Sequence, residues 1–257
     1  MTPQVRGLLL VGLVVAFAIG FVPLVQGTDP AVVATAPEVA IDIASRMWPP
    51  DVASLGALAS PLWDTFAMAT LGTLLALLLG LPVAVLAARN VTPSRTLAQP
   101  LATFVIVASR SVNSLVWALL LVAIVGPGTL AGLLAIGLRS IGFVAKLTAE
   151  AIEEVDPRPV EALTATGSEA IVVWRWAIGP QILPSFIATA LFRWEINIRE
   201  STVLGFVGAG GLGLELNSAM QALEWEKVST ILIVILLTVL GSEGLAARLR
   251  ARIIGDG

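Results

Sequence analysis

The chain contains no cysteine and no histidine, and each absence excludes a class of chemistry. Without cysteine there is neither a disulfide nor a thiolate metal site. Without histidine the chain lacks the common ligand of transition metals and the common general base at neutral pH. We therefore expect no bound metal, no cofactor and no catalytic residues.

Charged residues are also scarce, at 13% of a chain of 257 residues, whereas hydrophobic residues make up 57%. A soluble domain carries about 25% charged residues, so water is not expected to be the main solvent of this chain. A helix needs roughly 20 apolar residues to cross a bilayer. Segments of that kind lie near residues 7–26, 62–88, 98–125, 129–149, 184–206 and 228–247. They predict an all-α fold, a polytopic transmembrane helical bundle of about six spans, with residues 1–257 as a single domain.

The basic residues predict how the spans are oriented, because cytoplasmic loops carry an excess of lysine and arginine. If the N-terminus lies inside, the outer side receives Arg46 and Lys227, and the inner side receives Arg6, Arg89, Arg95, Lys146, Arg158, Arg175, Arg248, Arg250 and Arg252. An even number of spans returns the C-terminus to the cytoplasm. We predict a multi-pass protein of the inner (plasma) membrane with both termini cytoplasmic. The alternative for residues 7–26 is a cleaved signal peptide, but no convincing small-x-small cleavage site precedes Gln26.

Further arginines fall inside predicted spans, namely Arg110, Arg139, Arg193 and Arg199. On insertion scales a charge at the centre of a span costs about 2.5–3.5 kcal/mol, so such residues pair or line a wet path. In the fifth span helical geometry places Arg193, Asn197 and Glu200 on one face, and Glu195 and Arg199 on the opposite face. Two interpretations stay open: ion pairs that lock helices together, or a face that supplies cationic groups to an anion pathway.

Arg110 in the third span and Arg139 in the fourth add positive charge without an evident partner, and they favour an anionic substrate. Guanidinium suits phosphate-like oxyanions because its fixed donors bind two oxygens at once. The candidate residues of an anion pathway are Arg110, Arg139, Arg193, Asn197 and Arg199.

A glycine-rich run over residues 208–213 matches the G-x-G-x-x-G dinucleotide pattern. That pattern requires a preceding strand, but here it follows a hydrophobic helix, so nucleotide binding is not expected. We interpret Gly208, Gly210 and Gly211 as flexible backbone at the gate or mouth of a pathway, with a simple external turn as the alternative. The chain also has no G-x-x-x-x-G-K-[ST] phosphate loop, so any ATP hydrolysis belongs to a separate chain.

The segment 150–183 is the longest inner loop, and it contains Glu161, Ala162, Gly167 and Pro180. Their spacing resembles the coupling loop of ATP-binding-cassette (ABC) importer permeases, which reads Glu-Ala-Ala, three residues, Gly, nine residues, Ile-x-Leu-Pro. The positions that depart from this pattern are Leu163, Ala177 and Gly179. Taken alone, Glu161 has a second explanation, since a carboxylate in the first turn of a helix is favoured by the helix dipole.

The stretch from about residue 141 to 216 resembles the phosphonate-type (PhnE-like) branch of the binding-protein-dependent transport inner-membrane components. The resemblance rests on residues 141–147, 150–156, the coupling loop, 193–197 and 201–211. It implies an ABC importer permease (MetI-like) fold and a homodimer around one pathway. It also implies two cytoplasmic ABC ATPase subunits, an extracytoplasmic solute-binding protein, and a groove of the ATPase that receives Glu161, Ala162 and Gly167.

The expected function is that of a permease subunit, not an enzyme. It would move phosphonate or a related phosphorus oxyanion, such as phosphate or phosphite, into the cytoplasm by alternating access. Its partners would be the ATPases, the binding protein, a second copy of the chain and membrane lipid, but not nucleic acid. One alternative is an ABC permease for another small solute such as an amino acid. Another is an ion-gradient-driven secondary anion carrier, which would need no ATPase. A membrane-anchored scaffold or sensor would not explain the intramembrane arginines.

Overall fold

The computed structural model of the protein describes residues 10, 12, 13, 15, 17 and 29–254. Regular structure in these residues is helical throughout, which confirms the all-α prediction. The chain divides into two compact units, Met1–Pro49 and Pro50–Gly257. Most of the first predicted span, residues 7–26, lies outside the described residues. In the first unit helix α2 covers Pro30–Arg46, and the Asp29 side chain caps it by accepting a hydrogen bond from the Ala31 amide at 2.9 Å.

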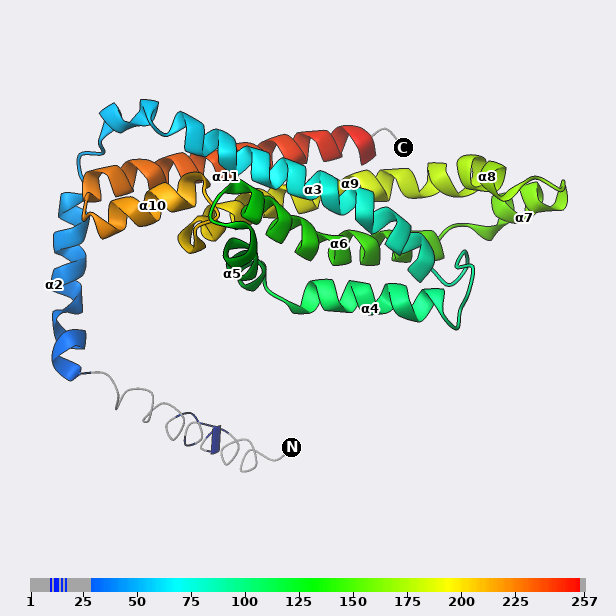
Figure 1. The fold of residues 1–257 in the computed structure, drawn as a ribbon, viewed down its shortest axis with the longest axis horizontal. Helices are drawn as coiled ribbons and strands as arrows, with labels where there is room; N and C mark the ends of the chain where they lie inside the picture. The colour runs from blue at the N-terminus through cyan, green and yellow to red at the C-terminus, as the bar shows by residue number, and fades with distance from the viewer. Residues whose placement is uncertain (1–9, 11, 14, 16, 18–28, 255–257) are drawn as a thin grey trace. The chain divides into compact units, whose positions relative to one another are not determined.

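Among the described residues, four helices of the second unit are long and apolar enough to cross a membrane. They are α3 (Ala59–Ala87), α6 (Thr129–Glu153), the continuous helical stretch Ala170–Val207, which contains α9 (Gly179–Leu204), and α11 (Trp225–Ile254). They correspond to the spans predicted near 62–88, 129–149, 184–206 and 228–247. Figure 1 shows these helices running along the long dimension of the second unit, with α6 in contact with both α3 and α9.

The predicted span 98–125 is not one helix. It is a pair, α4 (Ala98–Ser111) and α5 (Ser114–Val125), bent by 90°. The break has a local cause: Val112 is extended, and the Asn113 side chain caps α5 by accepting a hydrogen bond from the Leu115 amide at 3.0 Å. If the bent pair crosses the membrane as one span, the described residues contain up to five spans.

Helix α6 is the centre of the second unit, and small residues let α3 approach it closely. A Cβ atom added at Gly72 would lie 2.8 Å from Ile136 Cγ2, and one added at Gly80 would lie 3.0 Å from Val144 Cγ1. Ala76, one helical turn from each glycine, is fully buried. Small residues at this spacing allow tight helix packing in a membrane, where van der Waals contact drives association.

Ser109 of α4 forms hydrogen bonds with the backbone in the middle of α6. Its hydroxyl donates to the Leu138 carbonyl and accepts a hydrogen bond from the Gly142 amide at 2.9 Å. These two backbone groups are the partners that an uninterrupted α-helix joins to each other. The side chain therefore reaches into the hydrogen-bond ladder of α6, at a glycine whose Cβ would meet the Ile106 carbonyl oxygen at 2.6 Å.

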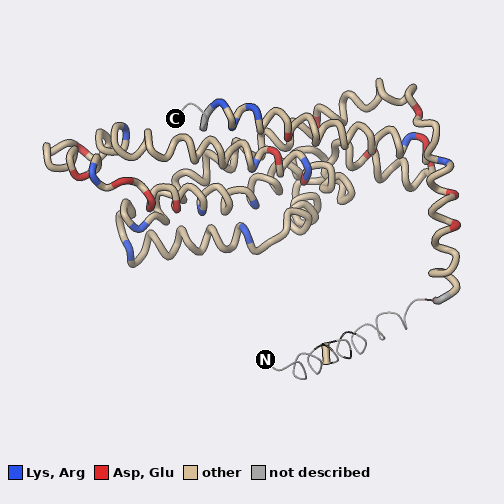
Figure 2. Tube along the Cα trace, turned by 180° about the vertical axis from the view of Figure 1, so that it is seen from behind, with Lys and Arg blue, Asp and Glu red and all other residues tan. Residues whose placement is uncertain are grey.

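The connection between α6 and α9 is shorter than the predicted loop 150–183, because α6 continues to Glu153 and α9 begins at Gly179. It contains α7 (Pro157–Ala165), α8 (Ala170–Val173) and a π-helical turn, Trp174–Ile178. In Figure 1 α7 and α8 lie at one end of the second unit, beyond the ends of α3 and α6. Charged residues are sparse along the long helices and denser in this connection, as Figure 2 shows. We call this connection the coupling segment.

Residues 207–227, predicted to be an outer connection, contain a further helix, α10 (Gly211–Gln221). Its apolar face is formed by Leu212, Leu216 and Ala219, all buried, at the spacing typical of an amphipathic helix. The Leu212 amide donates a hydrogen bond to the Thr65 hydroxyl of α3 at 2.9 Å, which anchors the start of α10. The short length of this apolar pattern explains why composition suggested a loop.

Candidate functional site

Three guanidinium groups gather around the ring of Phe143 in the middle of α6. Arg110 of α4 and Arg193 of α9 each lie 4.7 Å from the ring centroid, and Arg139 of α6 lies 5.7 Å from it. An aromatic face attracts cations through its quadrupole, so one ring can hold several guanidinium groups near one another. We call Arg110, Arg139, Phe143, Arg193 and Glu200 the arginine cluster.

The carboxylate of Glu200 is shared by two members of this cluster. Arg139 donates to it through Nη1, and Arg193 Nη2 lies 3.4 Å from both of its oxygens. The expectation that Arg139 has no partner is therefore wrong. Arg110 forms no ion pair with any described residue, so the cluster contains three cations and one carboxylate, and it is positive. The ion pairs expected under the first interpretation are present, and the anion pathway of the second interpretation stays a prediction.

A buried polar network fixes the orientation of Arg193. Its Nε donates to the Ser140 hydroxyl at 2.8 Å, and that hydroxyl donates to Asn197 Oδ1 at 3.2 Å. The Asn197 amide donates in turn to the Thr73 hydroxyl at 2.8 Å. Arg193 and Asn197 are 3% and 0% exposed, so in this conformation Asn197 positions the arginine and does not itself line an open path. A fully satisfied buried network of this kind is rigid.

Next to the cluster lies a pocket of about 280 Å³, which we call the α5 pocket. Its lining residues are Asn113, Ser114, Leu115, Arg139, Arg199, Glu200 and Val203. Asn113 accepts hydrogen bonds from the first-turn amides of Leu115, Val116 and Trp117, and the helix dipole of α5 gives this N-terminus a partial positive charge. The 90° bend between α4 and α5 brings this N-terminus beside two arginines. The pocket therefore offers a small anion both guanidinium donors and a helix dipole.

The opposite face of α9 binds α11. Glu195 accepts a hydrogen bond from Arg250 at 3.0 Å, and Arg199 pairs with Glu243 through an N–O distance of 2.5 Å. The helical face predicted for Glu195 and Arg199 is thus correct. For Glu195 the contact is an interhelical ion pair, whereas Arg199 also lines the α5 pocket.

In the coupling segment, α7 presents a polar surface outward. Val160 and Leu163 pack against the apolar cluster that includes Ile152 of α6, while Glu161 and Ala162 are exposed. The helix begins at Asp156, whose carboxylate accepts a hydrogen bond from the Arg158 amide at 3.0 Å. The Arg158 guanidinium and this amide lower the pKa of the Asp156 carboxyl below its ordinary value.

Gly167 follows Thr166, the C-cap of α7, and has a left-handed backbone at φ +75°. Apart from the two neighbours of Gly167 in the chain, no described residue has an atom within 4 Å of a Cβ added there, so the backbone conformation, and not steric crowding, requires glycine. Pro180 is exposed in the first turn of α9. Sequence patterns did not reveal Gln181, whose side chain accepts a hydrogen bond from the Asp156 amide at 3.0 Å and so joins the two ends of the segment.

The glycine-rich run forms a packed turn between α9 and α10. Gly208, Gly210 and Gly211 have φ of +87°, +85° and +70°. The Gly208 carbonyl accepts a hydrogen bond from the Gly128 amide at 2.9 Å, and a Cβ at Gly211 would lie 2.7 Å from Thr65 Oγ1. Helix α9 separates this turn from the coupling segment by 26 residues, or about 39 Å, which exceeds the roughly 30 Å of a bilayer's hydrocarbon core.

Comparison with known proteins places residues 80–255 in the family described as "Binding-protein-dependent transport system inner membrane component". The phosphite transport system permease protein PtxC of Stutzerimonas stutzeri is 44% identical over 197 residues, which cover 77% of this chain and 71% of that protein. The phosphate-import permease protein PhnE of Mycolicibacterium smegmatis is 42% identical over 249 residues. These cover 95% of this chain but 44% of the longer relative.

Solved structures share the fold. A chain of the MetNI methionine ABC transporter in an inward-facing conformation superposes with a TM-score of 0.68 at 21% identity, over 79% of this chain and 99% of that chain. A chain of an amino acid ABC transporter gives a TM-score of 0.66 at 22% identity. The predicted MetI-like permease fold is confirmed.

Proposed function

The chain belongs to the binding-protein-dependent transport system inner membrane components, and from this premise we propose that it carries a phosphorus oxyanion into the cytoplasm. Phosphonate, phosphite and phosphate form the proposed substrate class. Relatives named for phosphite transport and phosphate import support this class. The chain is a membrane permease subunit, and residues 1–257 would act as one transport domain.

The observation that carries the substrate class is the charge of the arginine cluster. The cluster holds three guanidinium groups and one carboxylate, Glu200, which pairs with Arg139 and Arg193, and Arg139 also lines the α5 pocket. Arg199, whose guanidinium also pairs with Glu243, and the N-terminus of α5 line the same pocket. An oxyanion that enters this pocket would lose hydrogen bonds to water and gain hydrogen bonds from guanidinium N–H groups. In a low-dielectric surrounding such donors bind anions more strongly than they would in bulk water.

The coupling segment is the proposed contact with the ATPase. Glu161 and Ala162 are exposed on α7, and the left-handed Gly167 sets the direction in which the segment leaves this helix. Two ABC ATPase subunits would hold the coupling segments of two copies of the chain. Closure of the ATPase dimer would then rock the helices between inward-open and outward-open states.

The same proposal orients the chain in the membrane. The coupling segment and both termini would face the cytoplasm, in keeping with the lysine and arginine bias. The glycine turn at Gly208, Gly210 and Gly211 would lie at the outer mouth, where an extracytoplasmic solute-binding protein delivers the substrate. The length of α9 between the two supports this assignment, since it is sufficient to cross the bilayer.

Proteoliposomes that contain the chain, its ATPase and its binding protein test the proposal. We expect ATP hydrolysis and uptake to be stimulated by phosphonate, phosphite or phosphate, and not by methionine. Arg193→Ala and Arg199→Ala should each lower uptake, whereas Arg248→Ala, at an exposed arginine of α11, should not. Stimulation by methionine alone would contradict the substrate class. Uptake without any ATPase would point instead to a gradient-driven carrier.

A further inference from the structure

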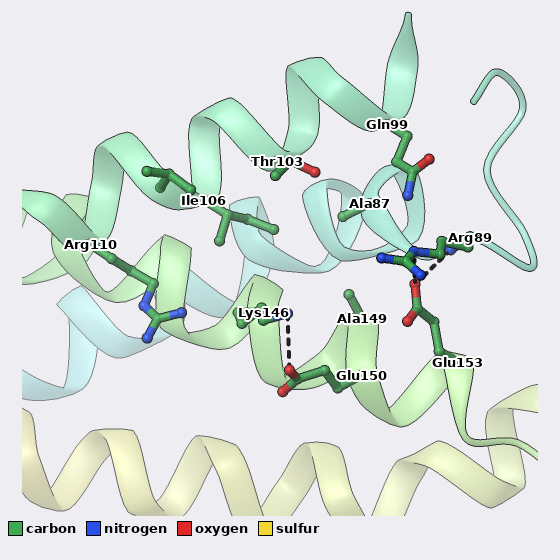
Figure 3. A pocket seen from close by; sticks show the side chains of 11 residues that line it. Ala87, Arg89, Gln99, Thr103, Ile106, Arg110, Lys146, Ala149, Glu150 and Glu153 are labelled. Atoms are coloured by element: carbon green, nitrogen blue, oxygen red, sulfur yellow. Dashed lines mark hydrogen bonds and ion pairs between the residues drawn. The ribbon is translucent and has the colours of Figure 1, made fainter. Parts of the chain in front are cut away.

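A second pocket, of about 220 Å³, opens between α4 and α6 on the side of the arginine cluster that faces the coupling segment. Figure 3 shows α4 on one side of it and α6 on the other. The polar residues that line it are Arg89, Gln99, Thr103, Arg110, Lys146, Glu150 and Glu153. We call it the α4–α6 pocket. None of the roles assigned above involves its lysine or its two carboxylates.

Two of the three cations of this pocket are already paired. Lys146 Nζ lies 2.9 Å from Glu150, and Arg89 contacts Glu153 through its backbone amide at 2.9 Å and its side chain at 3.9 Å (Figure 3). The third, Arg110, pairs with no carboxylate among the residues that the structure describes, and its guanidinium rests on Phe143. The charged residues that line the pocket therefore have one positive charge in excess, which a singly charged anion would neutralise.

Phe143 connects this pocket with the α5 pocket. Arg139 lines the α5 pocket, Arg110 lines the α4–α6 pocket, and both guanidinium groups contact the ring of Phe143. Along α6 the residues 139, 143, 146, 150 and 153 recur at intervals of three and four, so they share one face of the helix. One face of α6 thus runs from the α5 pocket, past the ring, to the α4–α6 pocket.

We propose that the α4–α6 pocket is a second binding site for a tetrahedral phosphorus oxyanion, on the inner side of Phe143. This inference rests on the proposed function, because it takes the transported anion as the occupant. Arg110 contacts the anion first, since it is the cation without a carboxylate partner. Lys146 then leaves its ion pair with Glu150 and binds the anion. The Lys146–Glu150 pair, which lies on one helix and is half-exposed, breaks when the substrate arrives from the cluster.

The absence of cysteine from the chain provides a direct test. Thr103→Cys places a single thiol in the wall of the pocket, at an exposed residue. The complete transporter, held in nanodiscs of neutral phosphatidylcholine, is treated with a water-soluble maleimide at increasing concentrations of phosphite or inorganic phosphate. We expect the anion to slow labelling in a saturable manner. Val107→Cys, which lines the same pocket, replaces Thr103→Cys if that variant folds poorly.

The charges of the pocket should determine this protection. Adding Arg110→Gln or Lys146→Gln to Thr103→Cys should raise the half-protecting concentration by about tenfold or more, the effect of losing one charge-assisted hydrogen bond. The matched control is Arg248→Gln, which removes one positive charge from α11 at an exposed position and should leave the half-protecting concentration unchanged.

Two results would overturn the inference. One is labelling that no phosphorus oxyanion slows, or slows equally with and without Arg110. The other is protection that requires anionic lipid in the nanodisc and is insensitive to free oxyanion, which would assign the pocket to a lipid headgroup. Uptake by the same wild-type complex in proteoliposomes is measured separately. Oxyanion uptake without protection refutes this second site alone, whereas absence of oxyanion uptake refutes the proposed function.

Discussion

Replacing Glu200 with glutamine tests whether the arginine cluster depends on its one carboxylate. In the folded chain Glu200 accepts hydrogen bonds from Arg139 and from Arg193, whose side chain is 3% exposed. Glutamine keeps the size of the side chain but removes its charge. The substitution therefore leaves neighbouring guanidinium groups without a counter-charge inside the helix bundle.

Removing one partner of a buried ion pair costs about 3–5 kcal/mol, because the remaining charge stays buried without compensation. We expect a loss near the lower limit, about 3 kcal/mol, since the side chains of Glu200 and Arg139 are 16% and 22% exposed and water screens part of the charge. For a chain of this size 1 kcal/mol corresponds to about 2–4 °C in the unfolding midpoint. The midpoint of Glu200→Gln should therefore fall by about 6–12 °C.

Thermal unfolding of the purified chain in detergent, followed by the fluorescence of its 7 tryptophans, measures this shift. Glu215→Gln is the matched control, because the pair of Glu215 with Lys227 is more exposed, at an N–O distance of 3.5 Å, and such pairs contribute about 0–1 kcal/mol. Phosphite should restore part of the stability lost in Glu200→Gln, since a bound anion replaces the missing charge. An unchanged midpoint in Glu200→Gln would show that the arginines do not depend on this carboxylate.

Three other substitutions test contacts elsewhere in the second unit. Gly80→Ala should cost about 1–3 kcal/mol in unfolding free energy, because the new methyl group would crowd Val144 of α6, and Val144→Ala in the same chain should recover most of the loss. Gln181→Leu removes the bond to the Asp156 amide, so it should lower the substrate moved per ATP hydrolysed in proteoliposomes while hydrolysis continues. Because Arg158 lowers the pKa of Asp156, this cap stabilises α7 above the unfolded pKa of about 3.9 and is lost as the pH falls through the lower folded value. The protection of the α7 amides against hydrogen exchange, measured relative to the intrinsic rate at each pH, should therefore fall between about pH 5 and pH 2 in the wild type, and this fall should be absent from Asp156→Asn.

Apolar length was sufficient to predict the long spans, because a helix that crosses a bilayer must carry about 20 apolar residues. It did not predict the break within residues 98–125. The only local sign of this break is the short polar stretch from Ser111 to Ser114. A mean hydropathy taken over about 20 residues hides so short a stretch. Helix α10 was missed for a related reason, since its buried residues Leu212, Leu216 and Ala219 cover only two turns.

Helical periodicity predicted correctly that Arg193, Asn197 and Glu200 share a face, because all three positions lie within one helix. Their partners could not be predicted in the same way. Ser140 is 53 residues from Arg193, and Arg139 is 61 residues from Glu200, so these contacts depend on how α6 packs against α9. No local pattern contains that information. The spacing of the coupling segment showed where its exposed residues lie, but not that Gln181 holds its ends together.

The hydrogen bonds of Ser109 make the last turn of α4 and the middle of α6 a single mechanical body. Val112, which is extended, is the first residue beyond this body at which the backbone can rotate without breaking those bonds. Helix α5, with 12 residues and a length of about 18 Å, packs against α6 and α9 beyond this point, so α6 holds both arms of the bend. The Asn113 cap lies at the corner between these two arms. An anion held there would keep the same floor while the walls around it changed from one opening to the other.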